Sequence, residues 1–300
     1  MGINVLSLFD GVRCGRVALE EAGIEVEKYY SSEINKYAMK IADKNYPQDI
    51  PHKLGDVCGI DVEKLPNINL LIAGFPCQSL SSSNVWLKEG EYGINGNGKS
   101  NLFWEFVRIY KELKIKNPNI KFLLENVGSA KIEDREIIDK ELGVKCIKFN
   151  SSLLSAQKRN RIYWSNIKFE VPSIRKELFM QDILEDKVDD KYYLTQKMYD
   201  CIMKPASKGW QSGKMEIDLK IARPLTATMH KMHRADTDNY VTGIAPTGKT
   251  KVRRLTPLEC ERLQTLPDNY TEGISDTQRY IVLGNGWTIS VIAHILKGIK

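Results

Sequence analysis

A thiol that directly follows a proline is the first feature of this sequence that could do chemistry. Cys77 lies in the segment GFPCQSL, residues 74–80, immediately after the apolar run 70–73. A thiol attacks only as its thiolate, whose unperturbed pKa is ~8.5, so a reactive cysteine is expected at a strand-to-helix corner beside positive charge. Pro76 fixes the backbone before it. Taken alone, the segment is also compatible with a buried structural cysteine, because most cysteines are simply buried.

A carboxyl group and a cluster of cations follow further along the chain. Glu125 ends the apolar run of FLLENV, residues 122–127, and the basic segment QKRNR, residues 157–161, leads into the apolar IYW. One guanidinium of this segment could contact a carbonyl oxygen and another the carboxylate. A carboxyl group at a closed strand end can donate a proton at neutral pH, but charged residues at strand ends are common, so neither motif is specific by itself.

The elements that must position these residues alternate between strand and helix. Residues 3–8 form an apolar run that ends at the glycine turn FDGVRCG, after which RVALEEAG has helical spacing. The next run, VEKYYSSE, ends at Glu33, 18 residues after Gly15. This is the βαβ layout in which an acidic residue binds ribose hydroxyls. A glycine turn without a ligand is the alternative, because FDGxxxG is not the dinucleotide motif GxGxxG.

The same alternation continues to about residue 165 and predicts an α/β fold with an open, mainly parallel sheet. Further strands are expected within residues 52–57, 68–77 and 121–127, and helices within 35–46, 102–114 and 135–143. Ligands of such sheets gather at the carboxyl ends of the strands. Asp56, Cys77 and Glu125 all fall at such ends, so we predict that they share one site.

The composition excludes several classes of protein. With 300 residues and 42% hydrophobic content the chain can bury a substantial core. No run approaches the ~20 apolar residues of a membrane span, and the first residues lack the features of a signal peptide, so a soluble, cytoplasmic protein without a membrane partner is expected. The six cysteines include no C-x-x-C pair, and His230 and His233 have no further ligand at metal-binding spacing. We therefore expect no metal.

The second half of the chain carries the positive charge. The formal net charge is +6, and residues 204–262 contain 12 Lys and Arg against 6 Asp and Glu, so the rest of the chain is formally neutral. A local basic segment indicates a nucleic-acid partner, although an ordinary solvated face is the alternative. From residue 165 to 251 the alternation is lost, which predicts a second, smaller domain. The long segment after Cys77, with four glycines among residues 90–98, predicts a mobile lid. A Gly-Asn-Gly turn at 284–286 is expected to open a final apolar helix.

Read in order, the motifs resemble those of the DNA (cytosine-5) methyltransferases from one end of the chain to the other: FDGVRCG, Glu33, Asp56, GFPCQS, ENV, QKRNR, RRLTPLECERLQ and GNGWT. The resemblance implies a Rossmann-like methyltransferase domain with a mainly parallel central sheet and a smaller, irregular target-recognition domain. It places the catalytic and cofactor-binding domain at 1–165, target recognition at 166–252, and the motif helix with the returning C-terminal segment at 253–300. It also implies double-stranded DNA as substrate and S-adenosyl-L-methionine as cofactor.

The resemblance assigns the catalytic roles by position. Cys77, aimed by Pro76, would add to C6 of a flipped-out cytosine so that C5 can accept the methyl group. Glu125 would contact N3 of the base, Arg161 would contact O2, and Arg159 would position Glu125. In a bacterial or phage-infected cell the enzyme is expected to be a monomer, with a cognate restriction endonuclease as a candidate partner.

The resemblance also assigns the binding residues. Glu33 would bind the cofactor ribose and Asp56 the adenine amino group, with the other cofactor positions at Phe9, Gly11, Val12, Ile34, Val57, Phe75, Leu102, Asn285 and Trp287. The residues expected to contact DNA are Gln78, Ser81, Ser83, Thr226, Thr228, His230, Lys231 and Arg234. Glu259 and Arg262 would be structural charges of the helix that organises the recognition domain.

Two departures from the family pattern and three alternative functions stay open. The first motif lacks the usual Gly-Gly ending, and Ile34 stands where an aromatic residue is usual. A tRNA cytosine methyltransferase on the same scaffold is one alternative, although its Cys-Phe-Thr signature is absent. A nucleic-acid-binding protein without activity is the second. A nicotinamide-dependent oxidoreductase is the third, and its glycine fingerprint is wrong.

Overall fold

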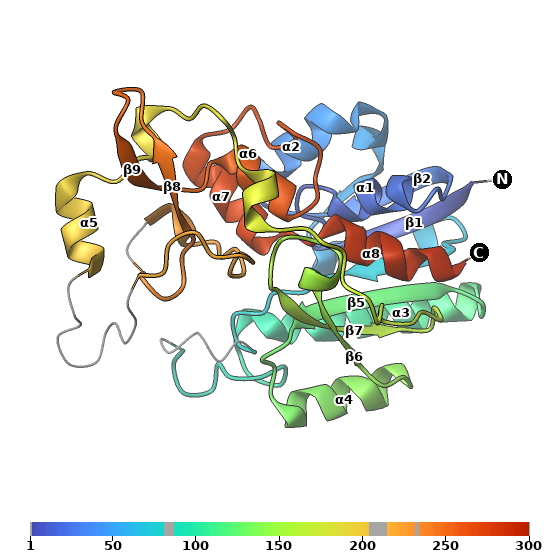
Figure 1. Ribbon diagram of the computed structural model, residues 1–300. Helices are drawn as coiled ribbons and strands as arrows, with labels where there is room; N and C mark the ends of the chain where they lie inside the picture. The colour runs from blue at the N-terminus through green and yellow to red at the C-terminus, as the bar shows by residue number, and fades with distance from the viewer. Residues whose placement is uncertain (1, 81–86, 204–214, 232–233, 300) are drawn as a thin grey trace. The chain divides into compact units, whose positions relative to one another are not determined.

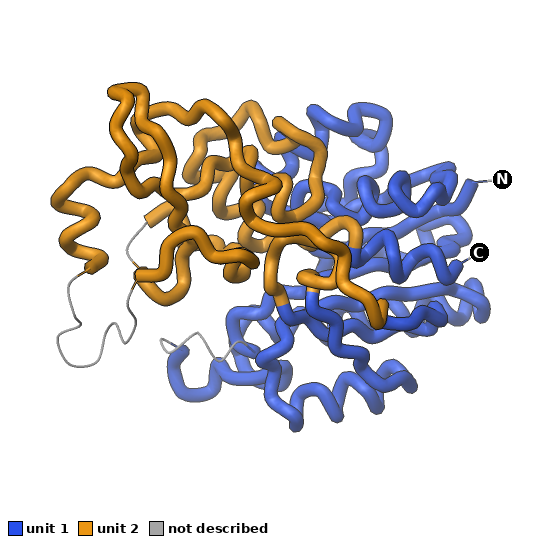
Figure 2. The backbone as a smooth tube through the Cα atoms, in the orientation of Figure 1, with its two compact units in different colours: residues 1–150, 160–171, 291–300 blue, residues 151–159, 172–290 orange. Residues whose placement is uncertain are grey.

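The fold of this chain divides into two units. The computed structural model describes residues 2–80, 87–203, 215–231 and 234–299. Unit 1 comprises residues 1–150, 160–171 and 291–300, and unit 2 comprises residues 151–159 and 172–290 (Figure 2). The boundaries expected at 165 and 252 do not coincide with this division, because residues 253–290 cluster with the irregular segment before them and only the last ten residues return to unit 1.

Unit 1 is built on a seven-stranded sheet of order β3-β2-β1-β4-β5-β7-β6 (Figure 1). β1 to β5 pair in parallel, and β7 runs antiparallel to both of its neighbours. The expected α/β fold with a mainly parallel sheet is therefore confirmed. The strands are β1 (Ile3–Leu8), β2 (Val26–Ser32), β3 (Lys53–Gly55), β4 (Leu70–Ala73), β5 (Lys121–Val127), β6 (Ile147–Asn150) and β7 (Asn160–Ser165).

The helices expected between these strands are present, with shorter bounds in places. They are α1 (Cys14–Glu21), α2 (Lys36–Asn45), α3 (Phe103–Lys116) and α4 (Ile132–Leu142) (Figure 1). Short 3-10 helices such as η2 (Val57–Gly59) and η4 (Lys99–Leu102) lie between these elements. Asn35 caps α2 by accepting the backbone N–H groups of Tyr37 and Ala38. This cap begins α2 just after Glu33.

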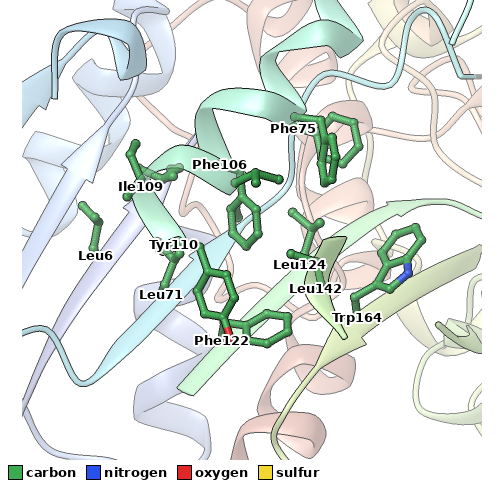
Figure 3. Close-up of a cluster of buried hydrophobic side chains, with 14 of the residues drawn as sticks. Leu6, Leu71, Phe75, Phe106, Ile109, Tyr110, Phe122, Leu124, Leu142 and Trp164 are labelled. Carbon is green, nitrogen blue, oxygen red and sulfur yellow. The ribbon is translucent and has the colours of Figure 1, made fainter. Parts of the chain in front are cut away.

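The register of the central strands gathers one set of alternate side chains into a core. Leu6 of β1 lies opposite Leu71 of β4, which lies opposite Phe122 of β5. Because side chains alternate between the two faces of a strand, these three share one face, and residues of α3 and α4 cover it. Figure 3 shows this cluster, in which Phe106 and Tyr110 of α3 lie beside Phe122. The residues that alternate with them along each strand, including Leu123 and Glu125 of β5, project to the other face.

Unit 2 contains less regular structure, as the sequence predicts. It holds the antiparallel pair β8 (Tyr240–Ile244) and β9 (Thr250–Arg254) and the helices α5 (Gln196–Met203), α6 (Pro257–Leu263) and α7 (Asp276–Asn285). The N-terminus of α6 carries a capping box, in which the side chains of Thr256 and Glu259 each accept a hydrogen bond from the backbone N–H of the other residue. Glu259, fully buried, also accepts two hydrogen bonds from the Arg253 guanidinium, at 2.7 and 2.8 Å.

The final helix does not begin as the sequence suggests. Gly284 and Asn285 are the last two residues of α7, and the break falls at residues 286–288, before α8 (Ile289–Leu296). Gly284 lies against the backbone of Thr226 and Ala227 so closely that a Cβ there would come within 2.3 Å of it. The glycine is thus required for close packing rather than for a turn. Within the described residues, the segment 276–299 is long and apolar enough to cross a membrane, but 56% of its most apolar window is buried in the protein, as is usual for a core helix.

Candidate active site

Cys77, Glu125 and Arg161 lie on or just after neighbouring strands, at the edge of the unit 1 sheet formed by the carboxyl ends of its parallel strands. Ala73 ends β4 and lies opposite Leu124 of β5, so Cys77 follows β4 at the end of the sheet where β5 runs on through Glu125 to Val127. Arg161 lies at the start of β7, opposite Val127. Because β7 is antiparallel, its start lies at the carboxyl end of β5. The edge predicted to hold the site therefore holds all three residues.

An ion pair joins Glu125 to Arg161. The Arg161 Nε atom lies 2.9 Å from Glu125 Oε1, and the two side chains are 17% and 12% exposed. Arg161 also donates to the carbonyl of Asn160 at 2.8 Å. The pair holds the carboxyl group in a defined position while both groups keep some access to solvent, which is the condition for contacting a ligand.

Arg159 lies in unit 2 and is buried among carbonyl groups. Its guanidinium donates to the carbonyl oxygens of Leu225, Gly284 and Gly286 at 2.8–3.0 Å. Two residues earlier, the fully buried Gln157 accepts the Leu225 N–H and donates to the Leu263 carbonyl. Arg159 thus ties together separate segments of unit 2. The positioning of Glu125 that the resemblance assigns to Arg159 stays a prediction.

The turn that carries Cys77 is fixed by side chains from two other elements. Asn126, beside Glu125, donates to the Phe75 carbonyl at 3.1 Å. The hydroxyl of Ser100, in η4, donates to the Pro76 carbonyl at 2.7 Å. Sequence reasoning missed both contacts, although Asn126 stands in the quoted motif ENV. The thiol itself is half-buried. Gln78 lies in this turn, and Ser81 and Ser83 lie outside the described residues.

The loop after β1 has an unusual backbone. Phe9, Gly11 and Arg13 have φ angles of 56°, 57° and 65°, so every second residue is left-handed, and two of the three are not glycine. Such conformations cost free energy, of the order of 1–3 kcal/mol for a side chain that is not glycine, and cluster where a loop holds a ligand. Val12, between them, is buried. The missing Gly-Gly ending is explained in part, because Arg13 adopts the conformation that glycine would take.

Glu33 is held beside this loop. Its carboxylate accepts the backbone N–H groups of Gly11, Ile34 and Asn35 at 2.7–2.9 Å. Two of these bonds go to Oε1 and one to Oε2, so by lone-pair count one position on Oε2 is left for a hydroxyl donor. A pocket lies here, lined by Asp10, Gly11, Arg13, Ser31, Glu33, Met39, Ala42 and Lys53. A ribose-containing cofactor fits this donor and acceptor set.

Asp10 and Arg13 form a buried charged group beneath the loop. Asp10 accepts the Tyr29 hydroxyl at 2.7 Å, and the fully buried Arg13 donates to the Tyr46 carbonyl at 2.8 Å. Arg13 lies 3.6 Å from carboxylate oxygens of both Asp10 and Asp49. Burial raises the pKa of Asp10 to about 7, although hydrogen bonds from Ser7 and Tyr29 and the charge of Arg13 oppose the shift. The sequence signal for this group was the arginine within the glycine turn.

The remaining cofactor positions differ in their surroundings. Asp56 caps η2 by accepting the Cys58 N–H at 3.0 Å, and Val57 behind it is buried. Phe75 is buried against Phe103, Leu102 is half-buried, and Ile34 is 73% exposed beside Glu33. Asn285 ends α7, and Trp287 lies in the segment that follows, both in unit 2. Their place in the cofactor pocket stays a prediction.

The residues expected to contact DNA in unit 2 are partly organised around one arginine. Arg234 donates to the hydroxyls of Thr226 and Thr228 at 2.7 and 2.6 Å and lies 3.3 Å from Asp238. His230 is half-buried, with Nδ1 3.1 Å from the Ala227 carbonyl, and Lys231 is exposed. His233 lies outside the described residues. Across the described part of the chain, no three His, Cys, Asp or Glu side chains gather as a metal would require.

Comparison with known proteins gives matches over almost the whole chain. Residues 3–300 match the profile of the family described as C-5 cytosine-specific DNA methylase. The type II methyltransferase M.NlaX of Neisseria lactamica is 30% identical over 99% of this chain and 96% of its own length. The type II methyltransferase M.HhaI of Haemophilus parahaemolyticus is 29% identical over 99% of this chain and 94% of its own length.

Solved structures share the fold. The Entamoeba histolytica methyltransferase EhMeth aligns over 100% of this chain and 98% of its own, with a TM-score of 0.77 and 20% identity. A mutant of Spodoptera frugiperda DNMT2 aligns over 99% of each chain, with a TM-score of 0.69 and 19% identity. At these identities the likeness concerns the fold alone, and it supports the Rossmann-like methyltransferase architecture predicted from the sequence.

Proposed function

Since this chain belongs to the C-5 cytosine-specific DNA methylase family, we propose that it methylates C5 of a flipped-out cytosine through a transient bond between Cys77 and C6. The protein is a DNA cytosine-5 methyltransferase whose methyl donor is S-adenosyl-L-methionine. The covalent route is the part proposed here. The observation that carries it is the Glu125–Arg161 ion pair, at the sheet edge where Cys77 follows β4.

The proposed route begins with the sulfur. C5 of cytosine is a poor nucleophile, so the Cys77 thiolate adds to C6, and the electrons of the 5,6 double bond move so that C5 becomes the nucleophilic carbon of an enamine. S-adenosyl-L-methionine, when bound, supplies the electrophilic methyl group. Loss of the C5 proton and breakage of the bond between sulfur and C6 then restore the double bond, and the thiolate leaves.

Glu125 and Arg161 are suited to the charge that this addition creates. As sulfur bonds to C6, negative charge develops toward N3 and O2 of the ring. A carboxyl group at N3 can donate a proton or hydrogen bond, and a guanidinium at O2 can stabilise the oxygen. Their mutual ion pair orients both before the base arrives, which lowers the cost of organising them during the reaction.

The binding residues are proposed from the same surroundings. Glu33 keeps one lone-pair position for a ribose hydroxyl, Asp56 would accept the adenine amino group, and the exposed Ile34 offers apolar surface for the adenine ring. Phe9, Val12, Val57, Phe75 and Leu102 would line the rest of the cofactor pocket. For Asn285 and Trp287 a cofactor role is proposed from the family resemblance alone.

The target base must leave the helix to reach the thiol. Extruding a base costs a few kcal/mol, and a loop that closes over the extruded base can offset that cost. The family resemblance assigns this role to the segment after Cys77, of which Gln78 is described, whereas Ser81 and Ser83 lie outside the described residues. Unit 2 would read a short target, with Thr226, Thr228, His230, Lys231 and Arg234 nearest the DNA. We further propose that the enzyme acts as a cytoplasmic monomer beside a cognate restriction endonuclease.

Trapping tests the proposed route directly. A duplex with 5-fluorocytosine at the target position should hold the wild-type protein covalently once the methyl group has been transferred, because fluorine cannot leave as the proton does. Cys77→Ala should form no adduct. A wild-type protein that methylates duplex DNA without ever forming this adduct would exclude the covalent route. Equal methyl transfer to a tRNA substrate would instead favour the RNA-modifying alternative.

A further inference from the structure

The hydroxyl group of Ser100 spans the turn that contains Cys77. Ser100 is fully buried in η4, 23 residues after Cys77 in the chain. Its Oγ donates to the Pro76 carbonyl at 2.7 Å and accepts the Ser79 N–H at 3.1 Å. One side chain thus binds the residue immediately before the cysteine and the residue two positions after it, so the backbone of Cys77 is held from both sides.

Other contacts hold the same turn, but each of them fixes a single position of it. The Leu80 N–H donates to the Cys77 carbonyl at 3.0 Å, which closes the turn, and the Gly93 N–H donates to the Ser79 carbonyl at 3.0 Å. Asn126 holds the Phe75 carbonyl. Ser100 differs from these because its hydroxyl reaches both ends of the short stretch Pro76–Ser79. It is attached to the core through α3, which begins at Phe103, fully buried, right after η4.

We propose that Ser100 is a positioning residue for the sulfur of Cys77. The inference rests on the proposed role of Cys77 as nucleophile. A reacting pair must approach within about 3–3.5 Å along a defined line, and an error of about 1 Å can cost ~100-fold in rate. Two hydrogen bonds from a buried group reduce the freedom of the turn in which the sulfur sits. Without the hydroxyl, the Pro76 carbonyl and the Ser79 N–H lose a shared partner and the turn can relax.

A purely structural role is the competing explanation, and the chain provides a matched control for it. Ser165, the last residue of β7, has the same pair of contacts: its hydroxyl donates to the Phe122 carbonyl and accepts the Ile167 N–H at 3.0 Å. Phe122 lies near the start of β5, at the opposite end of the strand from Glu125. Removing either hydroxyl should cost a similar amount of stability, but only one of the two contacts the turn of Cys77.

The test compares Ser100→Ala with Ser165→Ala in the full-length enzyme. Addition of the thiolate to C6 makes the C5 hydrogen exchangeable, so its replacement by deuterium in heavy water reports addition even when the methyl donor is left out. We expect Ser100→Ala to slow this exchange and single-turnover methyl transfer by ~10- to 100-fold while the Kd for duplex DNA stays within about twofold. Ser165→Ala should keep both rates close to wild type. Thermal unfolding of each variant sets the assay temperature below its transition.

Two results would overturn the inference. One is a Ser100→Ala exchange rate equal to that of wild type, and the other is an equal loss of rate in Ser165→Ala. If Ser100→Ala does not fold, Ser100→Cys keeps the side-chain volume with weaker hydrogen bonds, and a wild-type exchange rate in that variant would also count against it. The covalent route is judged separately: if wild type shows neither exchange nor the 5-fluorocytosine adduct, the proposed role of Cys77 fails, and the positioning role fails with it.

Discussion

Arg161 of β7 forms an ion pair with Glu125 of the adjacent antiparallel strand β5, with 2.9 Å between Nε and Oε1. The register in which β5 and β7 pair brings the two side chains together. Arg161 lies opposite Val127, two residues beyond Glu125, so the two charged side chains occupy diagonal positions on one face of the sheet. A shift of one residue in either strand would send one of them to the other face. The catalytic arrangement therefore depends on the strand pairing as much as on the residues.

The first prediction concerns this pair. Glu125→Gln and Arg161→Ala should each lower the methyl-transfer rate by ~10²- to 10³-fold, because each removes a group placed at developing charge. The double variant should lose far less than the product of the two effects, since the groups act as a unit. Single-turnover kinetics on duplex DNA measures this. Lys111→Ala breaks an exposed ion pair with Glu141 of similar length and should keep the wild-type rate. Strictly multiplicative losses would show that the two groups act independently.

The second prediction is a dependence of stability on pH that comes from Asp10. Burial raises its pKa in the folded protein to about 7 from the ordinary 3.8. Between these values the folded state binds the proton more tightly than the unfolded state, so the contribution of Asp10 to stability is largest below pH ~4 and is lost as the pH rises toward 7. Three pKa units correspond to at most about 4 kcal/mol.

Asp10→Asn removes this titration and keeps an acceptor for the Tyr29 hydroxyl. The free energy of unfolding of the variant, minus that of wild type, should rise between pH 4.5 and 7 and then level off in urea titrations followed by circular dichroism. Asp268→Asn is the control, because the hydrogen bond from Arg262 lowers the pKa of Asp268 and its contribution is lost only at lower pH. Its difference from wild type should be flat over the same range. A flat difference for Asp10→Asn would mean that Asp10 is ionised throughout.

These residues also show how much of the site can be predicted from the sequence. The strand ends that carry Glu33, Asp56, Cys77 and Glu125 were predictable, because apolar runs locate strands and parallel strands end at one edge. The left-handed conformation of Arg13 was not, since that position usually calls for glycine. The contacts of Ser100, and those of Arg159 with the carbonyl oxygens of Leu225 and Gly284, join segments far apart in the chain, and residue type alone does not predict such contacts.

The third prediction concerns the buried charges of unit 2. Glu259 accepts two hydrogen bonds from Arg253 and two from backbone N–H groups, those of Glu185 and Thr256. Glu259→Ala leaves the 2% exposed Arg253 without its carboxylate, so we expect a loss of ~3–5 kcal/mol in the free energy of unfolding of unit 2. Urea unfolding measures it. Asp268→Ala breaks the more exposed pair with Arg262 and should cost no more than ~1 kcal/mol. Similar losses for both variants would contradict a special role of the buried pair.

The last prediction separates two kinds of DNA contact in unit 2. Lys231 is exposed, whereas Arg234 is held by Thr226, Thr228 and Asp238. For Lys231 we proposed a DNA contact, and an exposed lysine contacts DNA mainly by neutralising a phosphate, so Lys231→Ala should weaken binding to all duplexes alike and reduce the slope of log K against log salt by ~1. Arg234→Ala releases two threonines from their shared partner. It should therefore weaken binding to the target more than to other sequences, because the segment that we propose to read the bases loses its defined conformation.

Binding isotherms at several salt concentrations measure both effects, on the target found by bisulfite sequencing of DNA from cells that express the enzyme and on a scrambled duplex. Lys145→Ala, in unit 1, removes a lysine whose side chain is 86% exposed, and it should leave the salt slope unchanged. If Arg234→Ala weakens binding to target and scrambled duplexes by the same factor, the arginine contributes to DNA binding through its charge and not by fixing the conformation of the segment. The role assigned to the hydrogen bonds with Thr226 and Thr228 would then be wrong.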